Sequence, residues 1–180
     1  IKKMDNKIPQ IISKHHEFFE QNITKNINFR LNQLKKLKEV LKANEVAMIT
    51  AIAKDFKKSE FETYTTELAP VYIEIKEAIR KVKKWAKIKK VRTNIVNFPA
   101  KSYIIPEPLG VSLIIGAWNY PYNLTFSPVV AAMAAGCTIV LKPSELTFNV
   151  SSVIKKIVNE NFPSDYFTVV EGGIAETQEL

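Results

Sequence analysis

Residues 111–123, which read VSLIIGAWNYPYN, join an apolar run to a loop that carries a large indole, an amide and a proline. The run Val111–Ile115 is typical of a strand buried on both faces, and the loop Gly116–Asn123 is expected to begin where that strand ends. Asn119 in this loop can donate its side-chain N–H to an oxygen that becomes negative during a reaction, a contact worth about 3 kcal/mol in an oxyanion hole. The alternative is an asparagine that satisfies its own turn, with Trp118 as an ordinary core aromatic.

The sequence after this loop alternates between helix-like and strand-like runs. The predicted elements are a helix over Ser127–Ala135, a strand over Thr138–Leu141, a helix over Asn149–Asn159 and a strand over Phe167–Val170. Pro128 near the start of the first helix and Gly136 just past its end are typical of helix boundaries. With the strand at Val111–Ile115 the order is βαβαβ, which predicts an α/β fold with a parallel sheet and right-handed crossovers.

The three predicted strands end in loops of unusual composition, and open parallel sheets bind ligands beyond the carboxyl ends of their strands. Lys142 and Glu145 can hold a ribose, because a carboxylate accepts hydrogen bonds from neighbouring hydroxyls and an ammonium group donates them. The alternative is a surface lysine followed by an acid that complements a helix dipole. Gly172 and Gly173 allow close approach of the backbone to a ligand, although Gly-Gly is also a common turn. No Gly-x-Gly-x-x-Gly occurs, so a bound pyrophosphate would not be held in the usual first-turn manner.

The sequence before residue 92 indicates amphipathic helices. Apolar residues recur at helical spacing over residues 29–41 and again over residues 61–85. Pro70 predicts a kink or a break in the second stripe, because it removes one intrahelical hydrogen bond.

Two extended pieces follow, Thr93–Phe98 and Lys101–Ile105, and they predict a two-stranded hairpin. Such a ribbon is marginal alone and needs a sheet or another subunit to pair with. The chain therefore divides into a helical part at residues 1–92, the hairpin at residues 93–109 and the βαβαβ part at residues 110–180.

The charge of the chain is uneven. Residues 1–101 hold 23 Lys and Arg against 11 Asp and Glu, whereas residues 102–180 hold 3 against 7. The densest basic cluster, Lys76–Arg92, raises nucleic acid as a partner. The same segment carries an apolar helical stripe, so its lysines are more simply the solvated face of a packed helix, and we expect no nucleic acid to bind.

Cysteine and histidine usage excludes several kinds of site. Cys137 is the single cysteine, so no intramolecular disulfide can form, and its place before an apolar run favours a small buried side chain over a reactive thiol. His15 and His16 are adjacent and offer no metal-ligand spacing. The N-terminus does not resemble a signal peptide, and the longest nearly apolar run, Pro128–Leu141, is too short to span a bilayer. We expect a cytoplasmic protein without a metal and without membrane contact in this segment.

Four segments, in chain order, resemble the aldehyde dehydrogenase superfamily. They are EPLGV at 107–111, IGAWNYP at 115–121, AAGC at 134–137 and LKPSE at 141–145. The sequence is most similar to the class 3 branch, which includes fatty and aromatic aldehyde dehydrogenases. That similarity lies in KSY at 101–103, NYPYNL at 119–124 and VEGGIAET at 170–177.

The resemblance implies a cofactor and the residues that hold it. Members of the family use NAD or NADP. Lys142 and Glu145 would hold the adenosine ribose of the cofactor. Ile115 and Trp118 would line the binding cleft, and Gly173 would lie near the adenine.

The resemblance also implies a reaction and an assembly. The family oxidises aldehydes to carboxylic acids through a cysteine thiohemiacetal, and Asn119 would be the oxyanion-hole amide beside it. Tyr122 would border the aldehyde tunnel. Residues 1–92 and 110–180 would belong to the cofactor-binding domain, the latter as the first half of a Rossmann-like sheet. The hairpin at residues 93–109 would belong to the oligomerisation ribbon of a homodimer.

The match also implies that the fold of the family is incomplete here. The family's glycine turn over the pyrophosphate, its general-base glutamate and its nucleophilic cysteine all fall beyond the position that matches Leu180. Cys137 matches a position that is not the nucleophile. We therefore expect this chain to be inactive alone. Two alternatives stay open: a truncated nucleotide-binding module without catalysis, and a basic nucleic-acid-binding protein.

Overall fold

A computed structural model describes residues 7–180 of the chain. The helices and strands are α1 (Lys7–Glu20), α2 (Ile27–Ala43), α3 (Glu45–Phe56), α4 (Glu60–Thr63), α5 (Ala69–Trp85), β1 (Lys89–Val91), β2 (Ser102–Ile104), β3 (Val111–Ile115), α6 (Asn123–Ala135), β4 (Thr138–Lys142), α7 (Phe148–Asn161), β5 (Phe167–Val169) and α8 (Ile174–Glu179). Three short turns separate some of them, namely 3-10 turns at Ile23–Lys25 and Ile95–Asn97 and a π-helical turn at Tyr64–Leu68.

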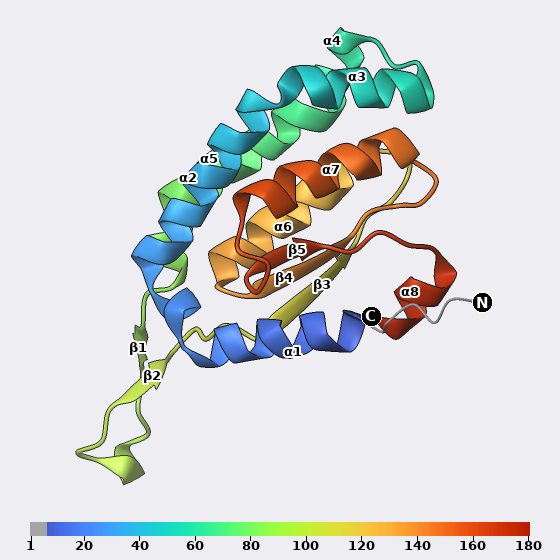
Figure 1. Ribbon diagram of the computed structural model, residues 1–180. Helices are drawn as coiled ribbons and strands as arrows, with labels where there is room; N and C mark the ends of the chain where they lie inside the picture. Colours follow the sequence, from blue (N-terminus) through green and yellow to red (C-terminus); the bar gives the residue numbers. More distant parts are fainter. Residues whose placement is uncertain (1–6) are drawn as a thin grey trace.

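The strands β3, β4 and β5 form a parallel sheet in that order, which confirms the predicted βαβαβ arrangement. The crossover helices α6 and α7 cover one face of the sheet, and α1 lies on the other face (Figure 1). Helices α2, α3 and α5 form an outer layer that packs on α6 and α7. The result is an α/β fold with helices on both faces of the sheet.

The amphipathic helices before the sheet form as their apolar spacing predicts. In α2 the stripe buries Leu34, Leu37 and Leu41. Asn26 starts this helix by accepting hydrogen bonds from two backbone N–H groups of its first turn, an ordinary N-cap. In α5 the buried stripe includes Ile75, and the core is continuous from these two helices through α6 and α7 to the sheet.

The predicted break at Pro70 takes the form of a change in helix type. Residues Tyr64–Leu68 form a π-helical turn, and α5 begins at Ala69 with the proline in its first turn. Because Pro70 has no N–H, it cannot donate to the carbonyl of Thr66 four residues earlier. That carbonyl instead accepts from the side-chain amide of Asn123, at 3.2 Å, so the break links the outer layer to α6.

Strand β3 is not buried on both faces, and that prediction is wrong. Only Ile114 is buried, whereas Leu113 and Ile115 are exposed. The reason is that β3 is the edge strand of the described sheet, paired with β4 on one side alone. Strand β4, which lies in the centre, is buried at every position.

Helix α6 begins at Asn123, one turn earlier than the sequence predicts, and Pro128 therefore lies inside it. The earlier start is possible because the side chain of Glu67 accepts the backbone N–H groups of Tyr122 and Asn123, which would otherwise lack partners. The end of the helix agrees with the prediction, since Gly136 closes it in a left-handed conformation with φ of 87°.

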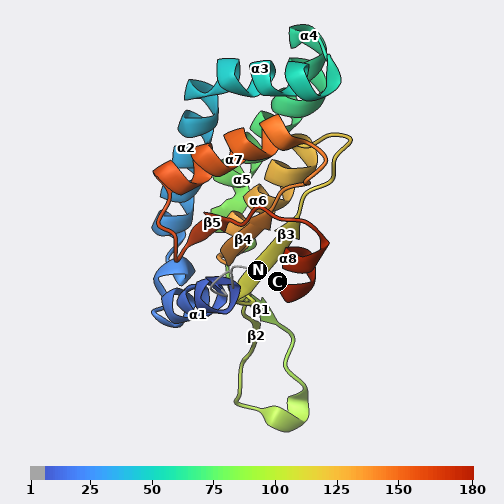
Figure 2. The ribbon, with the colours of Figure 1, turned by 45° about the vertical axis from the view of Figure 1, so that its right-hand side comes forward.

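The hairpin forms, but its first strand lies earlier than predicted. Strand β1 spans Lys89–Val91 and pairs antiparallel with β2, while the expected strand at residues 93–98 holds a 3-10 turn. The side chain of Asn94 accepts from the backbone N–H of Val96 and thereby favours that turn. The hairpin projects away from the layered part of the molecule (Figure 2).

Candidate active site

The carboxyl ends of β3, β4 and β5 lie along one edge of the sheet, and three loops leave it there. Ile115 pairs with Lys142 at the ends of β3 and β4. The backbone N–H of Gly116 then donates to the carbonyl of Lys142 at 2.8 Å, and that of Val170 donates to Leu141 at 2.9 Å. The loops that carry the candidate residues therefore begin side by side.

Gly116 is the turn through which the chain leaves β3. A Cβ atom at this position would lie 2.4 Å from Oγ1 of Thr125 on α6 and 3.4 Å from Cα of Pro143. Both neighbours are buried or closely packed, so a larger residue would push the first turn of α6 away from the sheet. The glycine thus sets the distance between the sheet and the loop of residues 116–123.

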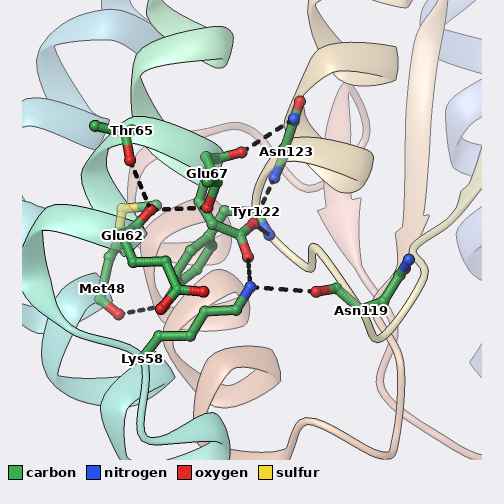
Figure 3. Close-up of polar contacts among 9 residues, drawn as sticks. Met48, Lys58, Glu62, Thr65, Glu67, Asn119, Tyr122 and Asn123 are labelled. Carbon is green, nitrogen blue, oxygen red and sulfur yellow. Dashed lines mark hydrogen bonds and ion pairs between the residues drawn. The ribbon is translucent and has the colours of Figure 1, made fainter.

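Glu67 holds the far end of this loop. Its side chain is fully buried, and its Oε2 accepts from the backbone N–H groups of Tyr122 at 3.0 Å and Asn123 at 3.1 Å. Its Oε1 accepts from the ammonium group of Lys58 at 2.8 Å. The carboxylate therefore joins the first turn of α6 to the outer helical layer (Figure 3).

Lys58 extends this network to the middle of the loop. Its Nζ donates to the main-chain carbonyl of Asn119 at 3.2 Å and lies 4.4 Å from the centroid of the Tyr120 ring. The side chain of Lys58 is 12% exposed, so the contact lies at the border of the core. The loop is thus held at residues 119, 120, 122 and 123 by two charged side chains.

The candidate oxyanion donor is available for a ligand. Asn119 is exposed, and within the part of the chain described its side-chain amide makes no hydrogen bond. Its main-chain carbonyl accepts from Lys58, and this contact does not use the side chain (Figure 3). Trp118 and Ile115, the predicted walls of the cofactor cleft, are both exposed at the same edge, so the indole is not a core aromatic.

Tyr122 occupies a different environment from the rest of the loop. Its ring is fully buried against Phe126, and its hydroxyl donates to the carbonyl of Met48 at 2.9 Å. Burial raises the pKa of this hydroxyl, with Glu67 and Asp55 adding to the effect. These contacts favour a structural role for Tyr122, and its position beside an aldehyde stays a prediction.

Lys142 and Glu145 are brought together as the sequence analysis expects of a ribose site. Lys142 is the last residue of β4 and only 3% exposed, while the side chain of Glu145 is 45% exposed, and the two form an ion pair. The hydrogen bond from Lys142 is the main reason why the pKa of Glu145 lies below its usual value. An ionised, accessible carboxylate with a fixed ammonium group beside it matches vicinal hydroxyls.

The third loop turns through Gly172 and Gly173 into α8. Gly172 has a φ of 157°, and a Cβ there would collide with the side chain of Glu176. That side chain accepts from the backbone N–H of Gly173 at 2.7 Å. A Cβ on Gly173 would meet no atom within 4 Å, so the backbone at this position borders open space where a flat ring can approach.

Taken together, the groups at this edge fit a dinucleotide. Glu145 and Lys142 offer an acceptor and a donor for a ribose, Ile115 and Trp118 offer apolar surface, and Gly173 leaves room for a base. The amide of Asn119 lies on the neighbouring loop, where it can donate to the reacting group of a substrate.

In the part of the chain that the structure describes, neither Cys137 nor a cluster of metal-ligating side chains adds to this edge. Cys137 is buried at the amino end of β4, at the opposite end of the sheet from these loops. Within residues 7–180 no three His, Cys, Asp or Glu side chains cluster in a way that could hold a metal ion. Of the described helices, none combines the length and apolar character that crossing a bilayer would require.

The basic segment at Lys76–Arg92 is built as a packed helix with a solvated face. Ala78 and Val82 continue the buried stripe of α5, while Lys81 forms an ion pair with Glu77 on the same helix. This supports the simpler interpretation of the lysine run.

The roles of Glu67 and Lys58 in holding the loop of residues 116–123 were not predicted from the sequence. Glu67 lies within the second apolar stripe, next to Leu68, where a carboxylate signals a buried partner. No pattern along the chain indicates that the partner is the loop 55 residues later.

Comparisons with known proteins agree with this geometry. The model of the aldehyde dehydrogenase family matches residues 3–180. The 4,4'-diaponeurosporen-aldehyde dehydrogenase of Staphylococcus aureus is 47% identical over 163 residues, which are 91% of this chain and 36% of that protein. Aldehyde dehydrogenase family 3 member A2 of Pongo abelii is 40% identical, over 86% of this chain and 32% of its own length. The dimeric NADP-preferring aldehyde dehydrogenase of Canis lupus familiaris is 37% identical, over 97% and 38%.

A solved structure gives the same result for the fold. The substrate-bound state of Staphylococcus aureus AldH superposes with a TM-score of 0.93 and 45% identity, covering 96% of this chain and 38% of that one. The chain spans about a third of the length of these relatives and matches their N-terminal portion.

Proposed function

The chain belongs to the aldehyde dehydrogenase family, and from this premise we propose that it forms the cofactor side of an enzyme that oxidises aldehydes to carboxylic acids. NAD or NADP supplies the hydride acceptor when bound. Lys142 and Glu145 hold the adenosine ribose, Ile115 and Trp118 border the cleft, and Gly173 leaves room for the adenine. Asn119 donates its amide N–H to the oxygen of the aldehyde as that oxygen gains negative charge.

The observation that carries this proposal is the common edge of the sheet. The exposed amide of Asn119 and the pair Lys142–Glu145 come from loops that start on adjacent strands, joined by the hydrogen bond from Gly116 to Lys142. A donor for a developing oxyanion and an acceptor for a ribose therefore lie on neighbouring segments. One bound dinucleotide and a carbonyl compound can therefore meet at the same edge of the sheet.

The substrate class and the assembly are part of the proposal. The relative from Staphylococcus aureus is named for a diaponeurosporene aldehyde, and the one from Canis lupus familiaris is named as dimeric. We propose long or medium-chain aliphatic or aromatic aldehydes as substrates. We also propose a homodimer, in which the projecting hairpin of β1 and β2 finds the partner that it lacks in the described chain.

The test is NAD(P)H formation by the complete protein with a long-chain aldehyde. Asn119→Ala is expected to lower kcat by about 10²–10³-fold and to leave the Kd of the cofactor unchanged, because the donor acts on the transition state. Glu145→Ala is expected to raise the Kd of the cofactor with a smaller effect on kcat. Matched controls are Asn28→Ala and Glu160→Ala, which remove an exposed amide and an exposed carboxylate away from this edge.

Two results would contradict the proposal. A complete protein that produces no NAD(P)H from any aldehyde, yet binds nucleotide in a manner weakened by Glu145→Ala, would favour the nucleotide-binding module. A protein whose kcat is unchanged by Asn119→Ala would remove the oxyanion role. A chain of residues 1–180 alone is expected to show no turnover.

A further inference from the structure

We infer that Lys58 and Glu67 are positioning residues that fix the loop of residues 116–123 and so aim the amide of Asn119. This inference rests on the proposed role of Asn119. It assigns to the outer helical layer a function in the reaction, although neither side chain lies on the loops that leave the sheet.

The contacts of Lys58 favour this role over a purely structural one. Its ammonium group has one partner in the core, Oε1 of Glu67 at 2.8 Å, and one on the loop, the carbonyl of Asn119 at 3.2 Å. It also lies over the ring of Tyr120, the next residue. The lysine thus holds the main chain of the very residue whose side chain is the candidate donor (Figure 3).

Glu67 fixes where that ammonium group can be. A fully buried carboxylate is costly unless its oxygens are all occupied, and here they meet two backbone N–H groups and one ammonium group. The N–H groups belong to the first turn of α6, which is itself held to the outer layer by Asn123 and Thr66. The carboxylate therefore has one position, and the lysine bound to it has little freedom to move.

The loop that carries Asn119 is therefore held at its start, its middle and its end. Gly116 ties the start of the loop to β4, Glu67 ties its end to α5 through the π-helical turn, and Lys58 ties its middle to Glu67. An oxyanion donor works when its direction is fixed before the reaction, and a displacement of about 1 Å can cost 10²-fold in rate. Removal of the Lys58 contact frees the middle of the loop while both ends stay held.

The experiment is a double-mutant cycle on the complete protein. Lys58→Met keeps the length and apolar stem of the side chain but removes the ammonium group and leaves Oε1 of the buried Glu67 without its cation. A denaturation curve of the variant therefore checks that it is folded before kcat is measured. We expect kcat to fall about 10- to 100-fold, with an unchanged Kd for NAD or NADP, since the ribose pair Lys142–Glu145 is held locally. In the Asn119→Ala background the same substitution is expected to change kcat by less than about 2-fold, because no amide is left to aim.

Two further variants complete the test. Lys58→Arg, which retains a cation able to reach both oxygens, is expected to recover most of the lost kcat. Lys54→Met removes an exposed positive charge from the same region and is expected to leave kcat and Kd unchanged.

The outcomes separate this inference from the proposed function. If Asn119→Ala lowers kcat and Lys58→Met does not, the positioning role is wrong while the oxyanion role stands. If Lys58→Met lowers kcat equally in both backgrounds, the lysine supports the structure as a whole and the inference is wrong. If Asn119→Ala leaves kcat unchanged, the proposed role of Asn119 fails and the inference fails with it.

Discussion

The loop after β3 and the loop after β4 leave the same edge of the sheet, but they are held in different ways. The first is anchored by Glu67 and Lys58, which lie more than 50 residues earlier in the chain and come from another layer. The second holds its candidate pair by local contacts, namely the ion pair of Lys142 with Glu145 and the contact of the Thr147 hydroxyl with the Ser144 carbonyl. Beyond the pair, Asp55 of α3 holds the start of α7 by accepting from the backbone N–H groups of Asn149 and Val150. The candidate catalytic donor therefore depends on the assembled helical layers, whereas the candidate ribose pair is held by a contact between residues only three apart in the chain.

Replacement of Glu67 tests the long-range anchor and is expected to have the largest effect. In Glu67→Ala the ammonium group of Lys58 and two backbone N–H groups lose their buried acceptor, so the free energy of unfolding should fall by about 3–5 kcal/mol. Chemical denaturation of the complete protein measures the loss. Glu62→Ala, at an exposed position of the preceding helix α4, should stay within about 0.5 kcal/mol of the parent. A loss below about 1 kcal/mol for Glu67→Ala would mean that the loop does not depend on this anchor.

His15, on the other face of the sheet, is a buried titratable residue that can be compared with Glu67. His15 on α1 is as buried as Glu67, but within the described residues neither ring nitrogen has a hydrogen-bond partner. Burial is the main reason why the pKa of His15 falls to about 4, while Asp165 opposes the shift. Between that value and about 6.5 the unfolded chain binds the proton more tightly than the folded one.

The stabilising contribution of neutral His15 is therefore complete above about pH 6.5 and is lost as the pH falls towards 4. Its full size is roughly 3 kcal/mol. Denaturation curves between pH 7.5 and 4 should show this loss in the parent and a shallower slope in His15→Leu, with His16→Gln as the exposed control. Equal slopes in the parent and in His15→Leu would contradict the prediction.

Gly116→Ala probes the point where the two loops touch. The added methyl group would lie 2.4 Å from Oγ1 of Thr125, which is buried and without a partner among residues 7–180. We expect a loss of about 1–3 kcal/mol in the free energy of unfolding. Because removal of that oxygen relieves the collision, Gly116→Ala combined with Thr125→Ala should lose less than the sum of the two single variants. Additive losses would show that the contact with Pro143, and not that with Thr125, limits the space.

Glu145→Gln tests the local loop and is expected to have the smallest effect on stability. The ion pair with Lys142 is half exposed, so the free energy of unfolding at neutral pH should change by less than about 1 kcal/mol. Since the pKa of Glu145 is lowered by Lys142, the contribution of the pair is present above the ordinary carboxyl pKa and is lost as the pH falls through the lower folded value. In Glu145→Gln the free energy of unfolding should lack this loss at acid pH. A stability loss as large as that of Glu67→Ala would remove the distinction between the loops.

The same distinction explains what the sequence could predict. The βαβαβ order, the helix end at Gly136 and the proximity of Lys142 to Glu145 depend on residues close together in the chain, and the structure shows all three. The ribose-binding role of the pair stays a prediction. Short-range patterns carry this information because strands, crossovers and helix ends are determined by local spacing and composition.

The features that sequence reasoning missed depend on contacts between distant residues. The burial of β3 was predicted wrongly because an apolar run does not reveal which strand lies at an edge. The start of α6 was placed too late because Pro128 suggested a first turn, whereas the acceptor that allows the earlier start is Glu67 on another helix. The first strand of the hairpin was misplaced because the turn made by Asn94 interrupts residues of high strand propensity.

The π-helical turn at Tyr64–Leu68 has a consequence for how this region can change in evolution. A π turn contains one residue more than the α-helical turn that it replaces, so deletion of a single residue there would restore a regular helix. The residues before and after such a deletion would keep nearly the same relative orientation, because the wide turn holds its extra residue within one turn. If the same residues formed a regular α-helix without a deletion, all residues before the turn would instead rotate by about 100° relative to α5. A homologous chain could keep a lysine, a glutamate and the asparagine loop at matching alignment columns and still not bring them together. The π-helical turn between Lys58 and Pro70 is therefore as much a part of this arrangement as the identity of the residues.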